Sequence, residues 1–418
     1  MLASMAPLSA AEADTSSLLF FAHFAAVDEP RRHAHKIVFP LELLLLTVFG
    51  AALSDMPGWQ GAADFARLKE AWLRRLCPWE GEGTPSADTL ERVMGKLDAE
   101  LFAECFSAWM RDVAARRAGA AAREAAARGA EPPVQHVAVD GKSVQGALTP
   151  GASTVPMHLV HTYLVEGRDG LLVGLAPAAG APGEARVAAE LLSLLELKGS
   201  VVTGDANLLT GPLADAVVSR GGDYVLCLKG NRGPAHAEVK EALCVAGQRH
   251  VLDEAKARAL CTSHCDGEEE KGHGRVERRC AWAFDAKHFP RVRGYLPHAQ
   301  SVLGVQRERT QVASGEESLE VHFYVSTRAP SEARAMADWV RAHWEVENGL
   351  HRELDCVLHE DAARVGAGPG AQNLAVVRRA ALAALKADTS FKASMPRRVR
   401  QAAHDDAYRT HLLTLVVS

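Results

Sequence analysis

Apolar residues recur at helical spacing through the first quarter of the chain. Leu41 to Leu53 is an almost unbroken apolar run that predicts a buried helix, and Ala62 to Leu76 places large apolar side chains on one helical face. Two more helices are predicted after Ser86 and after Asp98, because both positions offer an N-cap before an apolar periodic run. The pattern from about 15 to 112 therefore predicts a small all-α domain.

The pattern changes from helices to strands near residue 133. The segment from about 113 to 132 is rich in Ala and Arg and poor in large apolar residues, which predicts a polar helix or a linker. Beyond it, β-branched runs alternate with helical segments, and this alternation predicts a mixed sheet covered by helices. Strands are expected at 134–139, 158–165, 171–175, 200–205 and 223–228, with helices at 185–197 and 212–220.

Residues from about 231 to 330 interrupt this alternation and predict a β-rich insertion. Its strands are expected at 275–284, 301–310 and 320–326. Helical patterning then returns at 332–354 and 372–386. The second domain is therefore expected to extend from about 133 to 390, with 391–418 as a C-terminal tail.

The composition is typical of a globular protein. The chain has 418 residues, of which 48% are hydrophobic, and no apolar stretch reaches the length that spans a bilayer. The N-terminus lacks the basic and apolar regions of a signal peptide, so a cytoplasmic location without membrane association is expected.

The charge distribution gives a mixed indication about nucleic acid. The net charge of −5 argues mildly against DNA binding, because neutralising phosphates requires lysine and arginine. Basic residues are nevertheless clustered at 31–36, 275–279, 291–293, 307–309 and 397–400. Each cluster alone is more typical of a solvated face, but together they are compatible with a path for DNA.

Three motifs far apart in the chain each place one carboxylate in a setting suited to a divalent metal. Asp140 and Asp205 follow apolar, β-branched runs, and Glu347 lies in the helical pattern of 332–354. Two strand-borne Asp residues and a helix-borne Glu suit Mg²⁺-dependent phosphodiester chemistry. Each has a structural alternative: a hairpin turn at Asp140-Gly141, a strand-end cap at Asp205 and a solvated helical acid at Glu347.

His343 and His351 lie four residues before and after Glu347, so all three share one helical face. Val346 and Leu350 beside them are expected to be buried, and a carboxylate next to a buried seam tends to have a partner or a metal. The two histidines are candidates for metal ligands or for phosphate contacts, although such residues more often only satisfy neighbouring groups.

Several long motifs occur in a fixed order: Val139-Asp-Gly-Lys-Ser143, then 197–206, 221–231, 271–279, 343–351 and 360–364. In these motifs the chain resembles the DDE transposases of bacterial insertion sequences, specifically the group that contains the H-repeat-associated proteins. The resemblance covers about 16 to 390. It implies an α/β chain with an RNase H-like catalytic domain, a β-rich insertion before the Glu-bearing helix, and a small all-α domain in front.

The resemblance implies that Asp140, Asp205 and Glu347 are catalytic and hold two Mg²⁺ ions, for which Mn²⁺ would substitute. One ion would activate water or a DNA 3′-hydroxyl, and the other would stabilise the leaving oxygen. The substrates would be the element's terminal inverted repeats and target DNA, and a homodimer is expected because two ends must be held together. The expected DNA contacts are Lys142, Lys229, His273, Arg275, His343, Asn348 and His351.

Two positions depart from the pattern of related insertion-sequence transposases. Val340 and Leu354 stand where a tyrosine and a basic residue are common, so the phosphate contacts of those residues do not transfer. Three other functions stay open: a decayed copy kept as a non-catalytic DNA-binding regulator, a non-specific metal-dependent nuclease, and a small-molecule phosphohydrolase. The last lacks the usual Gly-rich phosphate loop.

Overall fold

The computed structural model of the protein describes residues 23–144, 157–166, 170–178, 181–267, 269–272, 274–363, 365–366 and 368–414. The chain divides into two compact units. Unit 1 comprises Met1–Arg117, Ser143–Met157 and Leu350–Ser418, and unit 2 comprises Ala118–Lys142 and His158–Gly349.

Unit 1 is built from helices around α2 (Leu41–Leu53). This helix is buried on nearly all sides because its sequence is apolar on nearly all sides, as predicted. It packs against α14 (Pro369–Ala387) and α3 (Gly58–Leu68). The other α-helices with bounds in this unit are α4 (Glu70–Leu76), α5 (Ala87–Met94), α13 (Arg352–Cys356), α15 (Met395–His404) and α16 (Asp406–Thr414).

Two helical predictions need adjustment. The expected helix at 62–76 is two helices, because the backbone leaves the helical region at Lys69 and turns Trp72 edge-on to Phe65, with ring centroids 5.9 Å apart. The polar segment at 113–132 is largely the second half of α6 (Ala99–Ala127), a single helix of 29 residues. Its many alanines favour the helical alternative over a flexible linker.

Unit 1 contains a fully buried ion pair. Arg379 of α14 donates from Nη1 to Glu360 Oε1 at 2.5 Å and from Nη2 to Oε2 at 3.2 Å, and both side chains are completely inaccessible. Such a two-point pair satisfies both partners, whereas either partner alone would leave an uncompensated buried charge.

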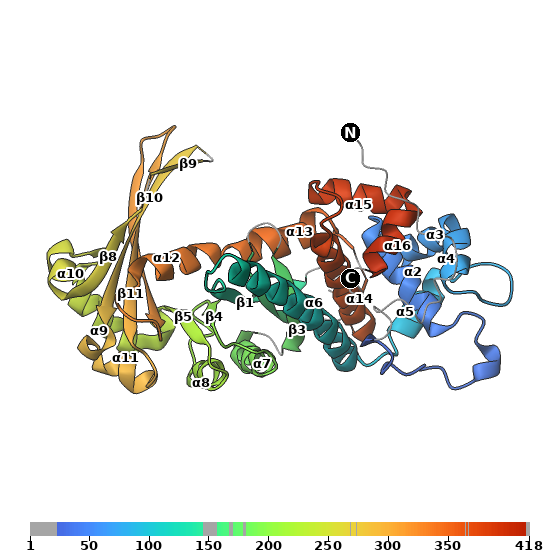
Figure 1. The fold of residues 1–418 in the computed structure, drawn as a ribbon, viewed down its shortest axis with the longest axis horizontal. Helices are drawn as coiled ribbons and strands as arrows, with labels where there is room; N and C mark the ends of the chain where they lie inside the picture. Colours follow the sequence, from blue (N-terminus) through green and yellow to red (C-terminus); the bar gives the residue numbers. More distant parts are fainter. Residues whose placement is uncertain are drawn as a thin grey trace. The chain divides into compact units, whose positions relative to one another are not determined.

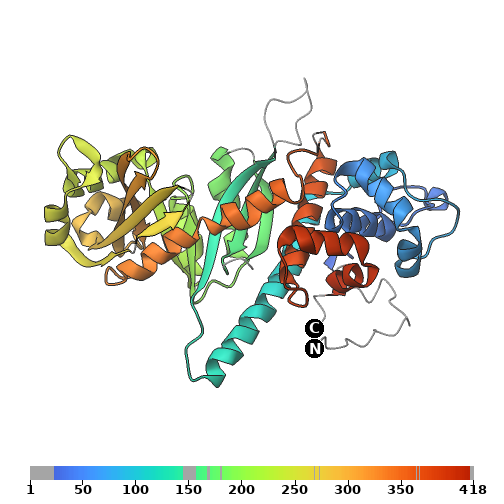
Figure 2. The same ribbon diagram turned by 90° about the horizontal axis from the view of Figure 1, so that it is seen from above.

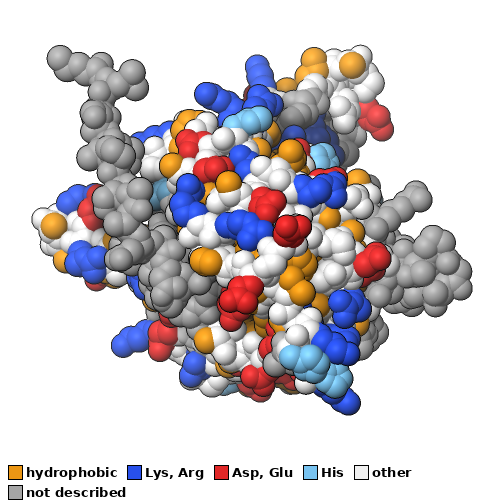
Figure 3. All heavy atoms as spheres, turned by 90° about the vertical axis from the view of Figure 1, so that its right-hand side faces the viewer, with side chains coloured by type: hydrophobic (Ala, Val, Ile, Leu, Met, Phe, Trp, Pro, Cys, Tyr) orange, Lys and Arg blue, Asp and Glu red, His pale blue; other side chains and the backbone are white. Residues whose placement is uncertain are grey.

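The surface of unit 1 carries both signs of charge. On the face shown in Figure 3, acidic and basic side chains are interspersed with hydrophobic ones. In the basic cluster at 31–36, Arg31 is engaged by Glu29 at 2.6 Å. Local pairing of this kind reduces the field that a row of arginines would otherwise present.

Among the described residues, no single helix is both long and apolar enough to cross a membrane. α2 and α3 meet the length and composition test only when taken together, and they are bent by 101° at their junction.

Unit 2 is organised around a mixed sheet of 10 strands (Figure 1). The strand order is β3-β2-β1-β4-β5-β12-β11-β10-β8, with β9 paired to β10. β1, β4 and β5 are parallel neighbours, and β12, β11 and β10 continue from β5 as antiparallel neighbours. The bounds are β1 (Gln135–Val144), β2 (Met157–Leu164), β3 (Leu171–Ala178), β4 (Ser200–Gly204), β5 (Asp223–Leu228), β8 (Cys261–Asp266), β9 (Glu270–Gly272), β10 (Arg275–Asp285), β11 (Ser301–Gln311) and β12 (Glu317–Ser326).

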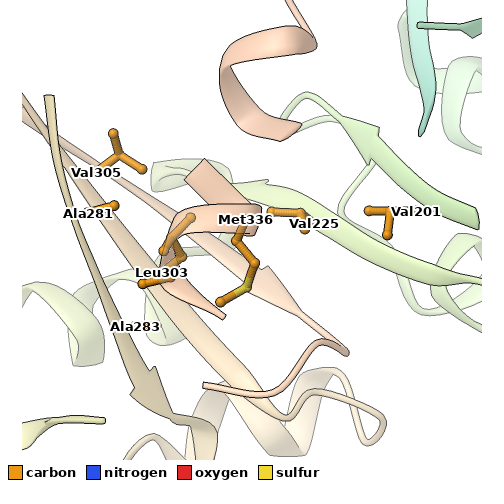
Figure 4. Packing of buried hydrophobic residues seen from close by; sticks show 8 residues of the cluster. Val201, Val225, Ala281, Ala283, Leu303, Val305 and Met336 are labelled. Atoms are coloured by element: carbon orange, nitrogen blue, oxygen red, sulfur yellow. The ribbon is translucent and has the colours of Figure 1, made fainter. Parts of the chain in front are cut away.

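The expected strands and the two crossover helices are present. α7 (Ala181–Ser193) begins and ends about four residues earlier than predicted, and α8 (Gly211–Ser219) begins one residue before Pro212, the proline that predicted its start. α12 (Ala333–Ala342) packs on β5, β8, β10 and β11 (Figure 2). Met336 of α12 lies with Leu303, Ala281 and Val225 in the apolar cluster of Figure 4. Burial of this apolar cluster helps to hold α12 on the sheet.

The β-rich insertion continues the main sheet through the pairing of β12 with β5. Its three predicted strands are confirmed as β10, β11 and β12. The prediction missed short elements whose apolar periodicity is too brief to register. These are α9 (Gly233–Leu243), α10 (Glu254–Leu260), α11 (Pro290–Tyr295), β6 (Cys244–Val245), β7 (Gln248–Leu252), β8 and β9.

Candidate active site

Asp140 lies inside strand β1 and is not part of a turn. The strand runs on to Val144, which excludes the hairpin alternative at Asp140-Gly141. The preceding residue, Val139, is the parallel partner of Gly204 on β4. The Asp140 carboxylate accepts a hydrogen bond from the Gly141 amide at 2.9 Å, which helps fix its orientation.

Asp205 directly follows β4, so the pairing of Val139 with Gly204 places the two aspartates on neighbouring parallel strands. Asp205 Oδ1 accepts hydrogen bonds from the amides of Asn207 at 2.9 Å and Leu208 at 3.4 Å. The side chain therefore has the strand-end capping role that the sequence allowed. Its charge also raises the pKa of Asp140. Asp205 can therefore cap the end of the strand and still lie near the first aspartate.

Glu347 opens a π-helical segment, Glu347–His351, that follows α12. The predicted uninterrupted helix over 332–354 is thus broken after Ala342. Val346 and Leu350 are buried as expected, while the Glu347 side chain is exposed. Glu347 and Asp140 offer carboxylate oxygens within 4.8 Å of each other, and His351, one turn further along the same segment, offers a ring nitrogen within that distance of Glu347. Single π-helical turns of this kind are frequent at functional sites.

The carboxylates repel one another. Burial and the charge of Glu347 raise the pKa of Asp140 to about 7, and the charges of Asp205 and Glu184 act in the same direction. Burial, then the charge of Glu184, also raises the pKa of Asp205, against the lowering effects of its two backbone hydrogen bonds and Lys229. Oxygen ligands crowded in this way fit a hard divalent cation, which would relieve the repulsion.

Sequence reasoning missed Glu184. This side chain of α7 is 4% exposed, and its charge acts on both aspartates. Its Oε1 lies 3.8 Å from Nε2 of His158 on β2. A Cβ on Gly141 would collide with both groups, so a larger residue there would require Glu184 and His158 to move. A single acid in an Ala-rich helical stretch carries no pattern that could have singled it out.

A hydrogen-bond chain joins β1, β4 and the helix that leads to Glu347. His136 Nε2 lies 2.7 Å from the Thr203 hydroxyl, and the same hydroxyl lies 2.8 Å from Nδ1 of His343. Burial, followed by the charge of His343, lowers the pKa of His136 to about 3. His136 is therefore neutral at physiological pH. Neither His136 nor Thr203 was singled out from the sequence.

The expected DNA contacts are in different environments. Lys142 is buried on β1, Lys229 is exposed after β5, and Asn348 is exposed beside Glu347. Asn348 Nδ2 donates to the Trp344 carbonyl at 3.2 Å. Arg275 lies at the start of β10, in a separate charged cluster. His273 lies outside the described residues.

Comparison with known proteins decides the family. Residues 132–383 match the family model described as "Transposase DDE domain", and residues 21–110 match the model "DDE_Tnp_1-associated". The chain belongs to the DDE transposase family. The resemblance found from its motifs is thereby confirmed.

This transposase-family chain has distant curated relatives in Escherichia coli. It is 26% identical to "H repeat-associated putative transposase YhhI" of strain K12 over 91% of this chain and 94% of the relative. It is 27% identical to "Putative protein YbfL" of the same strain with the same coverages, and 26% identical to "Putative transposase YncI" of O157:H7 over 89% and 88%. The similarity thus extends over nearly the full length of both chains.

Proposed function

We propose that this protein is a transposase that cleaves DNA at the ends of an insertion sequence and joins them to target DNA. The observation that carries the proposal is the approach of Asp140 and Glu347 to within 4.8 Å, with Asp205 on the neighbouring parallel strand. Membership of the DDE family supplies the reaction class. Cleavage followed by joining needs only one such carboxylate cluster, because both steps are attacks on a phosphodiester.

We further propose that the part of the sheet that carries the carboxylates is RNase H-like. The order β3-β2-β1-β4-β5, with β1, β4 and β5 parallel, supports this assignment. We retain the division into a helical domain at 15–112, a linker at 113–132 that is largely helical in α6, a catalytic domain at 133–390 with its insertion at 231–330, and a tail at 391–418 that forms α15 and α16.

Asp140, Asp205 and Glu347 would hold two Mg²⁺ ions, with Mn²⁺ as a substitute. Bound there, the ions would activate the attacking oxygen and stabilise the leaving oxygen. The raised pKa of Asp140 supports this role, because it arises from burial and from the nearby negative charges of Glu347, Asp205 and Glu184, which a bound cation would offset. Lys229 lies near Asp205 and lowers the pKa of that group, but burial and Glu184 outweigh it.

Other residues of unit 2 would position the carboxylates and the substrate. The Thr203 hydroxyl ties His343, and with it the start of the Glu347 segment, to β4. Lys229 is better placed than Lys142 to meet a phosphate, because Lys229 is exposed and Lys142 is buried. Asn348 is exposed beside Glu347, and its side-chain amide can donate a hydrogen bond to the backbone of DNA bound there.

The partners proposed are the terminal inverted repeats of the element and target DNA. Two ends must be brought together before they are joined, so we propose a homodimer in the DNA complex.

The test is Mg²⁺- or Mn²⁺-dependent cleavage of duplex DNA that carries the repeats flanking this protein's own gene. Asp140→Asn, Asp205→Asn and Glu347→Gln should each lower cleavage at the repeat boundary at least 100-fold. Asp215→Asn removes an equal charge from an exposed site on α8 and should cleave like the wild type. Cleavage that survives all three active-site changes would refute the proposal.

Two further outcomes separate the alternatives. Metal-independent binding of the repeats without any cutting would favour a DNA-binding regulator. Metal-dependent cutting that ignores the repeats, and is lost in Asp205→Asn, would favour a non-specific nuclease.

A further inference from the structure

One face of the β10–β11 ribbon carries a cluster of arginines around a single buried acid. Side chains two residues apart on a strand share a face, so Arg275, Glu277 and Arg279 of β10 lie side by side. Arg309 of β11 is the direct cross-strand partner of Glu277. We call these four residues the arginine face. Figure 1 shows β10 and β9 reaching beyond α12 at this end of unit 2.

Glu277 holds three guanidinium groups at once. Its Oε1 lies 2.8 Å from Nε of Arg275 and 2.8 Å from Nε of Arg309, and its Oε2 lies 2.5 Å from Nη2 of Arg279. The Glu277 side chain is only 7% exposed, whereas the three arginine side chains are 27% to 37% exposed. The acid therefore lies beneath the arginines, and the arginines face the solvent.

The cluster keeps an excess of positive charge. Arg279 also contacts Glu270 of β9 at 3.3 Å, and Glu270 in turn pairs with Arg341 of α12. Four guanidinium groups thus share two carboxylates. Arg275 and Arg309 use Nε for their contacts with Glu277, and within the described part of the chain no hydrogen bond engages their Nη groups. Those groups are the pair of donors that suits a phosphate.

The arginine face continues toward the catalytic carboxylates. A groove of about 240 Å³ lies beside the contact between α12 and the same face of the sheet, and Arg279, Arg307 and Tyr324 line it from the strands. Arg341 and Trp344 line the groove from the helix side. Trp344 lies three residues before Glu347 in the sequence. Trp344 is 63% exposed. Four arginines and two acids, Glu270 and Asp338, line the groove, so its lining carries a net positive charge. A net positive groove with an exposed aromatic ring is a combination that nucleic acids favour.

We propose that the arginine face binds the phosphate backbone of the DNA and that Glu277 is the positioning residue that spreads its arginines. This inference rests on the proposed function, since it takes DNA as the partner. Arg275 and Arg279 are four residues apart, which spans roughly 14 Å on a strand. That is about the axial length of four base pairs, so one face can follow several successive phosphates.

The proposal makes an unusual prediction for Glu277→Gln. Removing a negative charge from a DNA-binding surface should by simple electrostatics tighten binding. If Glu277 instead holds the arginines in place, the variant should bind more weakly, by about 5- to 10-fold. The slope of log K against log salt should also become shallower by about 1 to 2, because fewer phosphates are neutralised.

The experiment measures binding of full-length protein to fluorescent duplexes between 50 and about 300 mM NaCl. One duplex carries the flanking repeats and the other is unrelated, and both should respond alike because phosphate contacts carry no sequence information. Glu317→Gln is the matched control, since it removes the same charge from an exposed site on β12. Glu317 pairs with Thr310 of β11, and because neighbouring strand residues point to opposite faces, this pair lies on the face opposite Arg309. It should bind as tightly as wild type or slightly tighter. Glu277→Asp, which keeps the charge, should restore part of the loss.

The outcomes are distinguishable. If folded Glu277→Gln binds DNA as tightly as wild type, with an unchanged salt slope, the inference fails while the proposed function stands. Should Glu277→Gln unfold, Arg275→Gln and Arg309→Gln provide the test, and an unchanged slope in both overturns the inference. A wild-type protein that neither binds nor cleaves repeat DNA would instead overturn the proposed function.

Discussion

The Thr203 hydroxyl contacts Nδ1 of His343 at 2.8 Å, which links strand β4 to the residue that follows α12. The same hydroxyl reaches His136 on β1 at 2.7 Å. A hydroxyl has one proton to donate and accepts with its lone pairs, so it can serve both imidazoles at once. One small side chain therefore joins β1, which carries Asp140, β4, which ends just before Asp205, and His343, which lies four residues before Glu347.

Thr203→Val should lower metal-dependent cleavage by about 10-fold or more while leaving the fold intact. Valine keeps the shape but removes the hydroxyl, so the Glu347 segment loses its tie to the sheet, and small displacements of catalytic groups are costly. The unfolding free energy should also fall by about 1 to 3 kcal/mol, because buried His136 loses its partner. Cleavage rate and urea denaturation measure the two effects.

The control for that prediction is Thr162→Val. Thr162 is buried on β2, and its hydroxyl donates to the Gly174 carbonyl at 3.3 Å. Its loss should cost stability but not cleavage. Equal losses of cleavage in both variants would show that Thr203 acts only through general stability.

His136 should make the protein less stable in mild acid. Its folded-state pKa of about 3 lies below the ordinary value of 6.5, so the unfolded chain binds the extra proton between these values. The contribution to stability is complete above pH 6.5 and falls by about 1.4 kcal/mol for each pH unit below it. Urea denaturation from pH 7.5 to 5 should show a shallower decline for His136→Gln than for wild type. Parallel declines would contradict this assignment.

Asp140→Asn should stabilise the metal-free protein even as it abolishes cleavage. The folded-state pKa of about 7 exceeds the ordinary 3.8, so the ionised carboxylate opposes folding above pH 7 and ceases to matter below about pH 4. At pH 8 without metal, we expect a gain of about 1 to 3 kcal/mol in denaturation experiments. The gain should vanish near pH 4. Added Mg²⁺ should stabilise the wild type but not the variant.

Asp285→Asn is the control, because the charge of Asp285 should affect the free energy of unfolding with the opposite sign to that of Asp140. The backbone and side-chain hydrogen bonds from Lys287 lower the pKa of Asp285, so its charge favours the folded state. Replacing it should not stabilise the protein at pH 8. A gain in both variants would point to a general effect of reducing negative charge.

The Glu360–Arg379 pair should be strongly coupled. Arg379→Met or Glu360→Leu alone leaves one buried charge without its partner and should cost about 3 to 5 kcal/mol. The double variant should cost less than the sum, because it removes both charges. A double-mutant cycle by urea denaturation measures the coupling, and additive losses would contradict it. The exposed Arg186–Glu190 pair should show a coupling below about 0.5 kcal/mol.

Sequence patterns were informative where one residue class dominates a segment. The apolar run at α2, the β-branched runs of β4 and β5 and the turn residues between them gave element type and approximate bounds. The pairing of β1 with β4 was not readable from the chain, because register depends on contacts between distant segments. The ends of the apolar runs nevertheless led to Asp140 and Asp205, although β1 continues past Asp140 to Val144.

Features that arise only from tertiary contact were missed. Glu184 comes near Asp140 through the packing of α7 on the sheet, and nothing in its own helix distinguishes it. The π-turn at Glu347 replaces an α-helix that propensity alone favours, so local pattern gave the wrong geometry there. The burial of Lys142 was likewise not foreseen, since lysine is rarely buried.

The pairing of β12 with β5 fixes the distance between the arginine face and the catalytic carboxylates. Gly204, beside Asp205, shares one row of partners with Leu226, Val325, Val302 and Phe284 across five strands. Glu277 lies seven residues from Phe284 along β10, or roughly 24 Å. A hydrogen-bonded ladder spans that row without a flexible joint. If the arginine face binds one phosphate of the DNA, the number of residues in β10 then determines how many nucleotides lie between that phosphate and the bond that is cut.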